Sequence, residues 1–155
     1  MSRKLSKDDR VGTTVPAQPD PIDLAARALR QRDRSRYEID EQLARAGIGA
    51  EMRAESLATL ERLGYVDDNR FSTDRATALA ARGYGDAFIQ VDLERHGADA
   101  DSVALALAGL EPEHARARDQ LAHLGVTPRT VARLSRKGFA DESLEGIVAA
   151  DGDVP

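Results

Sequence analysis

The chain has 155 residues, of which 41% are hydrophobic and 32% are charged, so it is long enough to bury a core in one domain or in a short array of helical units. It contains no cysteine, which excludes disulfides, thiolate zinc sites and cysteine nucleophiles. Its net charge of −5 argues against a protein that coats nucleic acid indiscriminately. No segment has the pattern of a secretory signal or of a membrane span of roughly 18 apolar residues, so we expect a cytoplasmic protein without membrane contact.

The first segment is polar and basic. Residues 1–20 contain Arg3, Lys4, Lys7 and Arg10, and too few apolar side chains to offset the entropy of ordering the chain. We therefore expect a disordered basic tail over residues 1–20.

From Asp20 onward, apolar residues recur at the spacing of amphipathic helices, and helix stop signals stand at the breaks. Asp20 followed by Pro21 is typical of an N-cap with proline at the first helical position. Ser35 and Glu38 form a capping-box pattern at the start of a second helix. The full pattern predicts nine helices: one opening at Asp20, one running from Ser35 to Gly47, and seven over 50–63, 69–82, 85–95, 101–108, 112–124, 127–136 and 141–149. Residues 151–155 are expected to form a frayed tail.

Glycines mark the ends of six predicted helices, because glycine adopts the left-handed conformation of a C-terminal cap without strain. They are Gly47, Gly64, Gly83, Gly97, Gly125 and Gly138. In the third predicted helix, the residues expected to be buried are Met52, Leu57 and Leu60.

The predicted helices repeat. When the chain is aligned on Gly47, Gly97 and Gly138, a leucine stands four residues before each glycine and an arginine stands two residues before it. Ten residues after the three glycines stand Leu57, Leu107 and Val148. The offsets of 50 and 41 residues are typical of solenoid arrays, in which one unit cannot bury its own apolar face. The sequence therefore predicts an all-α fold of three tandem three-helix repeats over residues 21–66, 67–110 and 111–150; a nine-helix bundle without repeats is the alternative.

The sequence holds no catalytic or metal-binding pattern. His114 and His123 are nine residues apart, which places them on different faces of one helix, and His96 stands alone. The paired carboxylates fall on predicted polar faces and helix starts, where capping and solvation account for them. There is no glycine-rich phosphate loop and no Gly-x-Ser-x-Gly turn. We expect a protein that is not an enzyme and that binds no cofactor and no metal.

Arginine and tyrosine side chains gather at the predicted helix junctions. Equivalent junctions of a solenoid lie along one edge or face, so these groups could form a positive stripe for an acidic protein surface or a phosphate backbone. The alternative is that each arginine only complements the dipole of a helix end, and that each tyrosine only packs after a capping glycine. The candidate partner-binding residues are Arg34, Arg36, Arg82, Tyr84, Arg95, Arg136 and Lys137.

Three motifs between residues 22 and 110 resemble, in their order and spacing, the RecX family of RecA-regulatory proteins. They are Arg32-x-Arg34-Ser35-x-x-Glu38-Ile39-x-x-x-Leu43 before Gly47, then Leu60-Glu61-Arg62-Leu63-Gly64-Tyr65-Val66-Asp67-Asp68-x-Arg70-Phe71, and then Arg82-Gly83-Tyr84-Gly85-x-x-x-Ile89-x-x-x-Leu93.

The resemblance implies an elongated, curved array that acts by contact and carries out no chemistry itself. It implies a protein that binds the RecA filament, reaches single-stranded DNA through that filament, and restrains recombinase, ATPase and co-protease activity in recombination, DNA repair and the SOS response. We expect it to be a monomer.

The chain departs from the family pattern at several positions. Asp86 stands where the family often has proline, and Phe88 stands where a basic residue is common. The third unit, often rich in lysine, carries the acids Glu111, Glu113, Asp119, Asp141, Glu142 and Glu145. These departures favour contact with a protein over strong direct binding to DNA. Two other functions remain open: a helical protein that binds DNA directly without a recombinase, and a helical-repeat scaffold for another protein.

Overall fold

The computed structural model describes residues 17–151, which form helices and connecting loops without a strand. Most of the two predicted tails lies outside the described residues. For the tail over 1–20 the structure describes only residues 17–20, and for the tail over 151–155 it describes only Asp151. The helices of the described part are α1 (Pro21–Gln31), α2 (Arg36–Arg45), α3 (Ala50–Arg62), α4 (Asp68–Ala81), α5 (Asp86–Arg95), α6 (Ala100–Ala108), α7 (Glu113–Leu124), α8 (Pro128–Arg136) and α9 (Asp141–Asp151).

Local signals explain where these helices begin and end. The Asp20 side chain accepts a hydrogen bond from the Ile22 backbone N–H at 2.8 Å, which confirms the predicted N-cap. Both arms of the predicted capping box are present, since Glu38 N–H donates to Ser35 Oγ and Ser35 N–H donates to Glu38 Oε2. All six glycines predicted as helix stops have a positive φ, from 76° to 90°.

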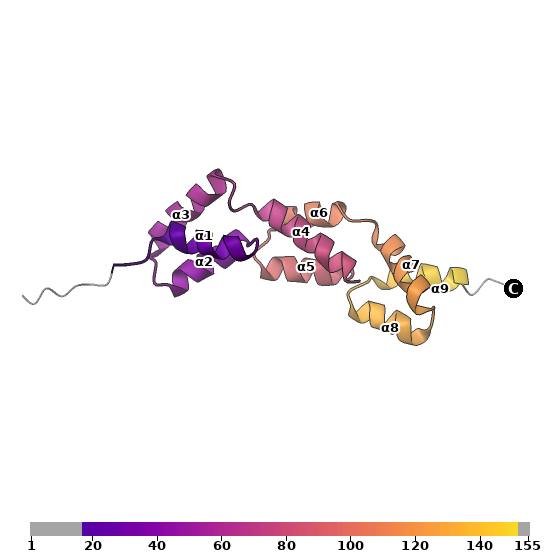
Figure 1. Cartoon of the computed structure of the whole chain (residues 1–155). Helices are drawn as coiled ribbons and strands as arrows, with labels where there is room; N and C mark the ends of the chain where they lie inside the picture. Colours follow the sequence, from indigo (N-terminus) through magenta and orange to yellow (C-terminus); the bar gives the residue numbers. More distant parts are fainter. Residues whose placement is uncertain (1–16, 152–155) are drawn as a thin grey trace, which may run out of the picture.

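The helices pack in threes, and the three groups follow one another along an elongated molecule (Figure 1). Each group has its own hydrophobic core, centred on a leucine of its second helix. These leucines, which are fully buried, occupy the position four residues before the aligned glycines: Leu43, Leu93 and Leu134. The all-α prediction is confirmed, and we keep the ranges 21–66, 67–110 and 111–150 as our proposal for the repeat units.

One prediction of a buried residue is wrong, and one aligned position of the repeats differs in burial. Met52 is 50% exposed, because α3 turns Ser56, Leu57 and Leu60 toward the first core instead. Val148, the counterpart of Leu57 in the aligned repeats, is 41% exposed. In the third group, α9 buries Leu144 and partly buries Ile147, and the next residue along a helix points about 100° away from the core.

Successive groups are joined by a contact that occurs twice. The N–H of Arg36, the first residue of α2, donates to Asp68 Oδ1 at 2.7 Å, and Asp68 is the first residue of α4. Fifty residues on, the N–H of Asp86, the first residue of α5, donates to Glu113 Oε1 at 2.8 Å, and Glu113 is the first residue of α7. In both cases a carboxylate of one group satisfies an unpaired N–H at the positive end of a helix in the group before it.

Candidate partner-binding site

The structure brings three of the seven candidate residues together. Arg82, Tyr84 and Lys137 meet where the end of α4 and the end of α8 converge, between the second and third helix groups. Lys137 Nζ lies 4.6 Å from the centre of the Tyr84 ring, and Arg82 Cζ lies 5.5 Å from it. Both distances are in the range of cation–π attraction. On the same ring, Phe88 stacks with a distance of 4.1 Å between ring centres. We call Arg82, Tyr84, Phe88 and Lys137 the Tyr84 cluster.

The backbone explains this convergence. Gly83, with φ of 79°, ends α4 and reverses the chain, so that Tyr84 lies beside the last turn of its own helix. Lys137 is the C-cap of α8, and its Nζ donates to the Arg82 carbonyl at 2.9 Å. In return, the Gly85 N–H donates to the Lys137 carbonyl at 2.9 Å. Two helix C-termini therefore meet here, and their partial negative charges stabilise cations.

The cluster continues along α8 as a cationic surface. Arg129, Arg133 and Arg136 are spaced by four and three residues, which places them on one face of this helix, and α8 contains no acidic residue. We call these three arginines and Lys137 the α8 basic face. Among the residues that the structure describes, none of the four forms an ion pair, and the same holds for Arg82.

The electrostatics of Lys137 reflect this crowding. Its pKa is lowered, first by burial and then by the nearby charges of Arg133 and Arg82. A neighbouring anion would offset that repulsion, so the surface favours an acidic ligand. Phe88, Arg129 and Arg133 are not among the predicted candidates, although the spacing of the α8 arginines is a signal that the sequence contains.

Of the other four candidates, Arg136 belongs to the α8 basic face, and the remaining three lie elsewhere. Arg36 is engaged within the chain, with its Nε 3.0 Å from Glu61 Oε1, and Arg34 Nε donates to the Ala28 carbonyl at 3.4 Å. Both residues lie at the start of α2, next to the contact between the first two helix groups. Arg95 and Arg136 are exposed in the last turns of α5 and α8, where the helix dipole favours a cation.

The pKa of Asp86, the first residue of α5, is raised above its ordinary value. Burial is the largest cause, and Glu113 adds to it, while the guanidinium of Arg116 acts in the opposite direction. Asp86 forms an ion pair with Arg116 Nη2 and is therefore a structural carboxylate at the junction.

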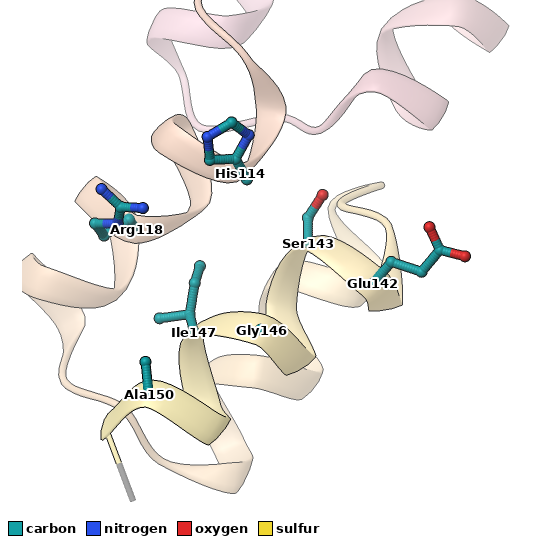
Figure 2. A pocket seen from close by; sticks show the side chains of 7 residues that line it. All are labelled: His114, Arg118, Glu142, Ser143, Gly146, Ile147 and Ala150. Carbon is teal, nitrogen blue, oxygen red and sulfur yellow. The ribbon is translucent and has the colours of Figure 1, made fainter. Parts of the chain in front are cut away.

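A separate hollow of about 450 Å³ lies between α7 and α9 (Figure 2). His114 and Arg118 of α7 face Ser143, Gly146, Ile147 and Ala150 of α9 across it. The Ser143 hydroxyl donates to Glu113 Oε2 at 2.9 Å, in the cap of α9. Over residues 17–151, no group of three or more histidine, cysteine, aspartate or glutamate side chains is placed to hold a metal ion. Nor is any helix of that part long and apolar enough to cross a bilayer.

The fold and this surface define an elongated all-α protein made of successive three-helix groups. No family model matches the chain. It is 30% identical to the regulatory protein RecX of Stenotrophomonas maltophilia (strain R551-3) over 148 residues, which cover 89% of this chain and 91% of that protein. It is 31% identical to the regulatory protein RecX of Mycobacterium ulcerans (strain Agy99) over 142 residues, covering 83% of this chain and 82% of that protein.

Solved structures show the same fold. A crystal structure of RecX from Lactobacillus salivarius matches with a TM-score of 0.74 and 16% sequence identity, over 86% of this chain and 96% of that chain. A second crystal structure of a regulatory protein RecX gives a TM-score of 0.72 with 18% identity, over 84% of this chain and 72% of that one. The chain belongs to the RecX family of regulatory proteins, and the resemblance predicted from its motifs is confirmed.

Proposed function

We propose that this protein binds the RecA filament on single-stranded DNA as a cytoplasmic monomer and restrains its recombinase, ATPase and co-protease activities. Membership of a regulatory family supports a role by contact rather than by chemistry. The observation that carries the proposal is the α8 basic face next to the Tyr84 cluster, a group of cations without an ion pair in the described residues of a chain whose net charge is −5.

The chemistry of this surface fits an acidic protein region. Arg82 and Lys137 are held in place by the Tyr84 ring, and Lys137 also by the carbonyl at the end of α4, so these two cations lose little conformational entropy when a carboxylate binds. Local attraction of this kind survives a net negative charge, since charges farther away than about 10 Å are screened at 0.1 M ionic strength. We therefore propose Arg82, Tyr84, Arg136 and Lys137, with Arg133 added, as filament-contacting residues; Arg34, Arg36 and Arg95 stay weaker candidates.

The test is DNA-stimulated ATP hydrolysis by the cognate RecA, titrated with this protein at substoichiometric and stoichiometric ratios. We expect inhibition by the wild type and weaker inhibition by Arg133→Glu. The matched control is Arg118→Glu, because Arg118 is also exposed in the third helix group but lies on α7, away from the α8 basic face. Equal inhibition by both variants would remove the α8 basic face from the proposal. No effect of the wild type, together with no binding to the filament, would favour the scaffold function.

One observation favours direct DNA binding as a second function: three arginines lie on one face of α8, and arginine side chains are common donors to phosphate oxygens. That function predicts that affinity for single-stranded DNA alone falls steeply with salt, with a slope of about −0.7 per phosphate neutralised on a logarithmic plot. Weak binding to free DNA at physiological salt, with strong binding to the filament, would exclude it.

A further inference from the structure

An apolar groove of about 480 Å³ lies between α1 and α3, at the opposite end of the molecule from the α8 basic face. Ile22, Ala26 and Leu29 line it from α1, and Leu60 and Leu63 line it from α3. Tyr65, which follows α3, lines it as well. Leu63 is 59% exposed and Tyr65 is 60% exposed, so the groove is open to solvent. We call it the α1/α3 groove.

The second helix group shows what the same position looks like when it is closed. Fifty residues after the three α1 residues of the groove stand Ser72, Ala76 and Leu79 of α4. All three are buried, and α4 makes its closest packing with α6, the counterpart of α3. These positions are therefore covered on α4 by its own helix group, whereas the equivalent positions on α1 are partly open to solvent.

At the 50-residue offset of the aligned repeats, the two helices bury different positions. α1 buries Ala25 and Ala28, whereas α4 buries the residues equivalent to the next positions along the helix, which are turned by about 100°. The two helices also end differently. Asp33 stands in place of Gly83, and α1 leaves through an extended backbone at Arg32 rather than through a left-handed glycine.

The residues of the open face of α1 are apolar, although polar residues are favoured where a helix faces water. The first of them, Ile22, is larger and more apolar than its buried counterpart Ser72. Contiguous apolar side chains on an open, concave surface cost hydration free energy and are typical of docking sites. An amphipathic helix that lays its apolar side into such a groove would bury Leu63 and Tyr65.

The charged residues near the groove indicate which charge a bound segment would carry. Arg30 is the one charged residue among the seven that line it. Arg27 lies one turn earlier on α1, and Arg62 precedes Leu63. None of the acidic residues of the two helices lines the groove; they are Asp23, Glu51, Glu55 and Glu61. None of these three arginines forms an ion pair with any residue that the structure describes. The groove edge therefore fits an occupant with acidic flanks.

We propose that the α1/α3 groove binds an amphipathic segment of a partner protein, apolar on one side and acidic at its flanks. The chain's own residues 1–16 do not fit this description, because their charged side chains include Arg3, Lys4, Lys7 and Arg10. The inference does not rest on the proposed function, since the groove and the α8 basic face share no residue.

The probe is a fluorescently labelled 16-residue helical peptide in which leucines at positions i, i+3, i+4 and i+7 are set among glutamates and alanines. Its matched control has lysines in place of the glutamates. Fluorescence anisotropy with the full chain is expected to show binding of the acidic peptide and weaker binding of the basic one. Leu63→Asp is expected to lower the affinity for the acidic peptide by about tenfold or more. Leu105→Asp is the matched control, because Leu105 is 56% exposed on α6, outside the groove, and should leave the affinity unchanged.

Several outcomes would overturn the proposal. They are no binding of the acidic peptide, equal affinity of the Leu63→Asp and Leu105→Asp chains, and tighter binding of the basic peptide. A wild-type dimer that Leu63→Asp dissociates in sedimentation would make the occupant a second copy. If Leu63→Asp shifts the NMR signals of residues 1–16, the occupant is the chain's own N-terminal segment. Inhibition of RecA by Leu63→Asp separates the two proposals, because loss of the groove leaves the α8 basic face intact.

Discussion

At the scale of single residues, Arg116 joins the second and third helix groups. Its side chain is only 10% exposed, and its guanidinium donates to the carbonyls of Tyr84 and Glu111, both at 2.9 Å. The same group pairs with Asp86 and lies 5.8 Å from the centre of the Phe139 ring. We expect Arg116→Ala to lower the free energy of unfolding by about 2 to 3 kcal/mol, because it leaves a carboxylate and two carbonyls without their donor. Urea denaturation measures this change.

Arg118 supplies the control for that prediction. It lies on the same helix but is exposed, so Arg118→Ala is expected to change the free energy of unfolding by about 0.5 kcal/mol or less. If the two variants were equally stable, Arg116 would not hold the junction.

Asp92 is a residue for which the structure predicts a contribution to stability that depends on pH. Burial tends to raise its pKa, but hydrogen bonds from Arg75 and the charges of Arg75, His96 and Arg95 outweigh burial and lower it below the ordinary 3.8. One of these bonds joins Arg75 Nη2 to Asp92 Oδ1 at 2.9 Å. Since the pKa is lower in the folded chain, the carboxylate stabilises the fold above its unfolded pKa, and that stabilisation is lost as the pH falls through the folded pKa.

We therefore expect the difference in unfolding free energy between the wild type and Asp92→Asn to be full near pH 6 and to shrink as the pH falls below about 4. Urea denaturation at several pH values measures it. A difference that stays constant down to acidic pH would mean that Asp92 contributes through packing and not through its charge.

At the scale of elements, Gly138 serves two purposes at the end of α8. Its φ of 90° disfavours any side chain, and a Cβ at this position would clash with the backbone nitrogen and Cβ of Phe88. Gly64 has a comparable φ of 76°, but a Cβ there would have no neighbour within 4 Å. Comparing alanine at the two positions therefore separates backbone strain from the close approach of two helix groups.

We expect Gly64→Ala to cost about 1 to 2 kcal/mol from the left-handed backbone alone, and Gly138→Ala to cost clearly more. The added cost includes the Ala87 N–H bond to the Gly138 carbonyl, 3.1 Å long, which joins the second and third groups. Urea denaturation of the two variants measures both losses of unfolding free energy. Equal costs would mean that the loop after α8 can move away from α5 without loss.

The ends of the helices are the part of the fold that the sequence predicts best. Asp20, Ser35 and the six capping glycines act through bonds to residues near them in the chain, so their roles follow from local patterns. The contacts between groups are different. Arg116 reaches Tyr84 across 32 residues, and Lys137 reaches Arg82 across 55, so no periodic pattern predicts them. For the candidate site, the sequence predicts which residue types lie at the helix junctions. It does not predict that the ends of α4 and α8 contact each other.

The acids of the third unit illustrate the same limit. The sequence alone indicates that Glu113 makes the third unit less positive than is common in the family and so weakens binding to DNA. In the structure, its Oε1 accepts from the Asp86 N–H at 2.8 Å, and its Oε2 accepts from the Ala140 N–H at 3.1 Å. One carboxylate thus caps α5 and the start of α9 together. Glu113 therefore has a structural role, and only the packing of the groups reveals it.

At the scale of the whole molecule, a net charge of −5 and the α8 basic face act over different distances. The Debye length falls from about 10 Å at 0.1 M salt to about 3 Å at 1 M, so added salt weakens repulsion between distant acids first and close attraction last. Filament binding through a few exposed arginines is nevertheless expected to weaken as salt rises, because each ion pair formed there exchanges with counterions.

The slope of that decline tests where the contact lies. We expect the affinity for the RecA filament, measured by co-sedimentation between 0.1 and 0.5 M salt, to fall less steeply for Arg133→Ala than for the wild type, since one cation fewer takes part. Arg118→Ala removes the same charge from α7, outside the α8 basic face, and should keep the wild-type slope. If both variants lowered the slope equally, only the total charge would matter. If neither variant lowered it, the partner would have to contact another face of the array.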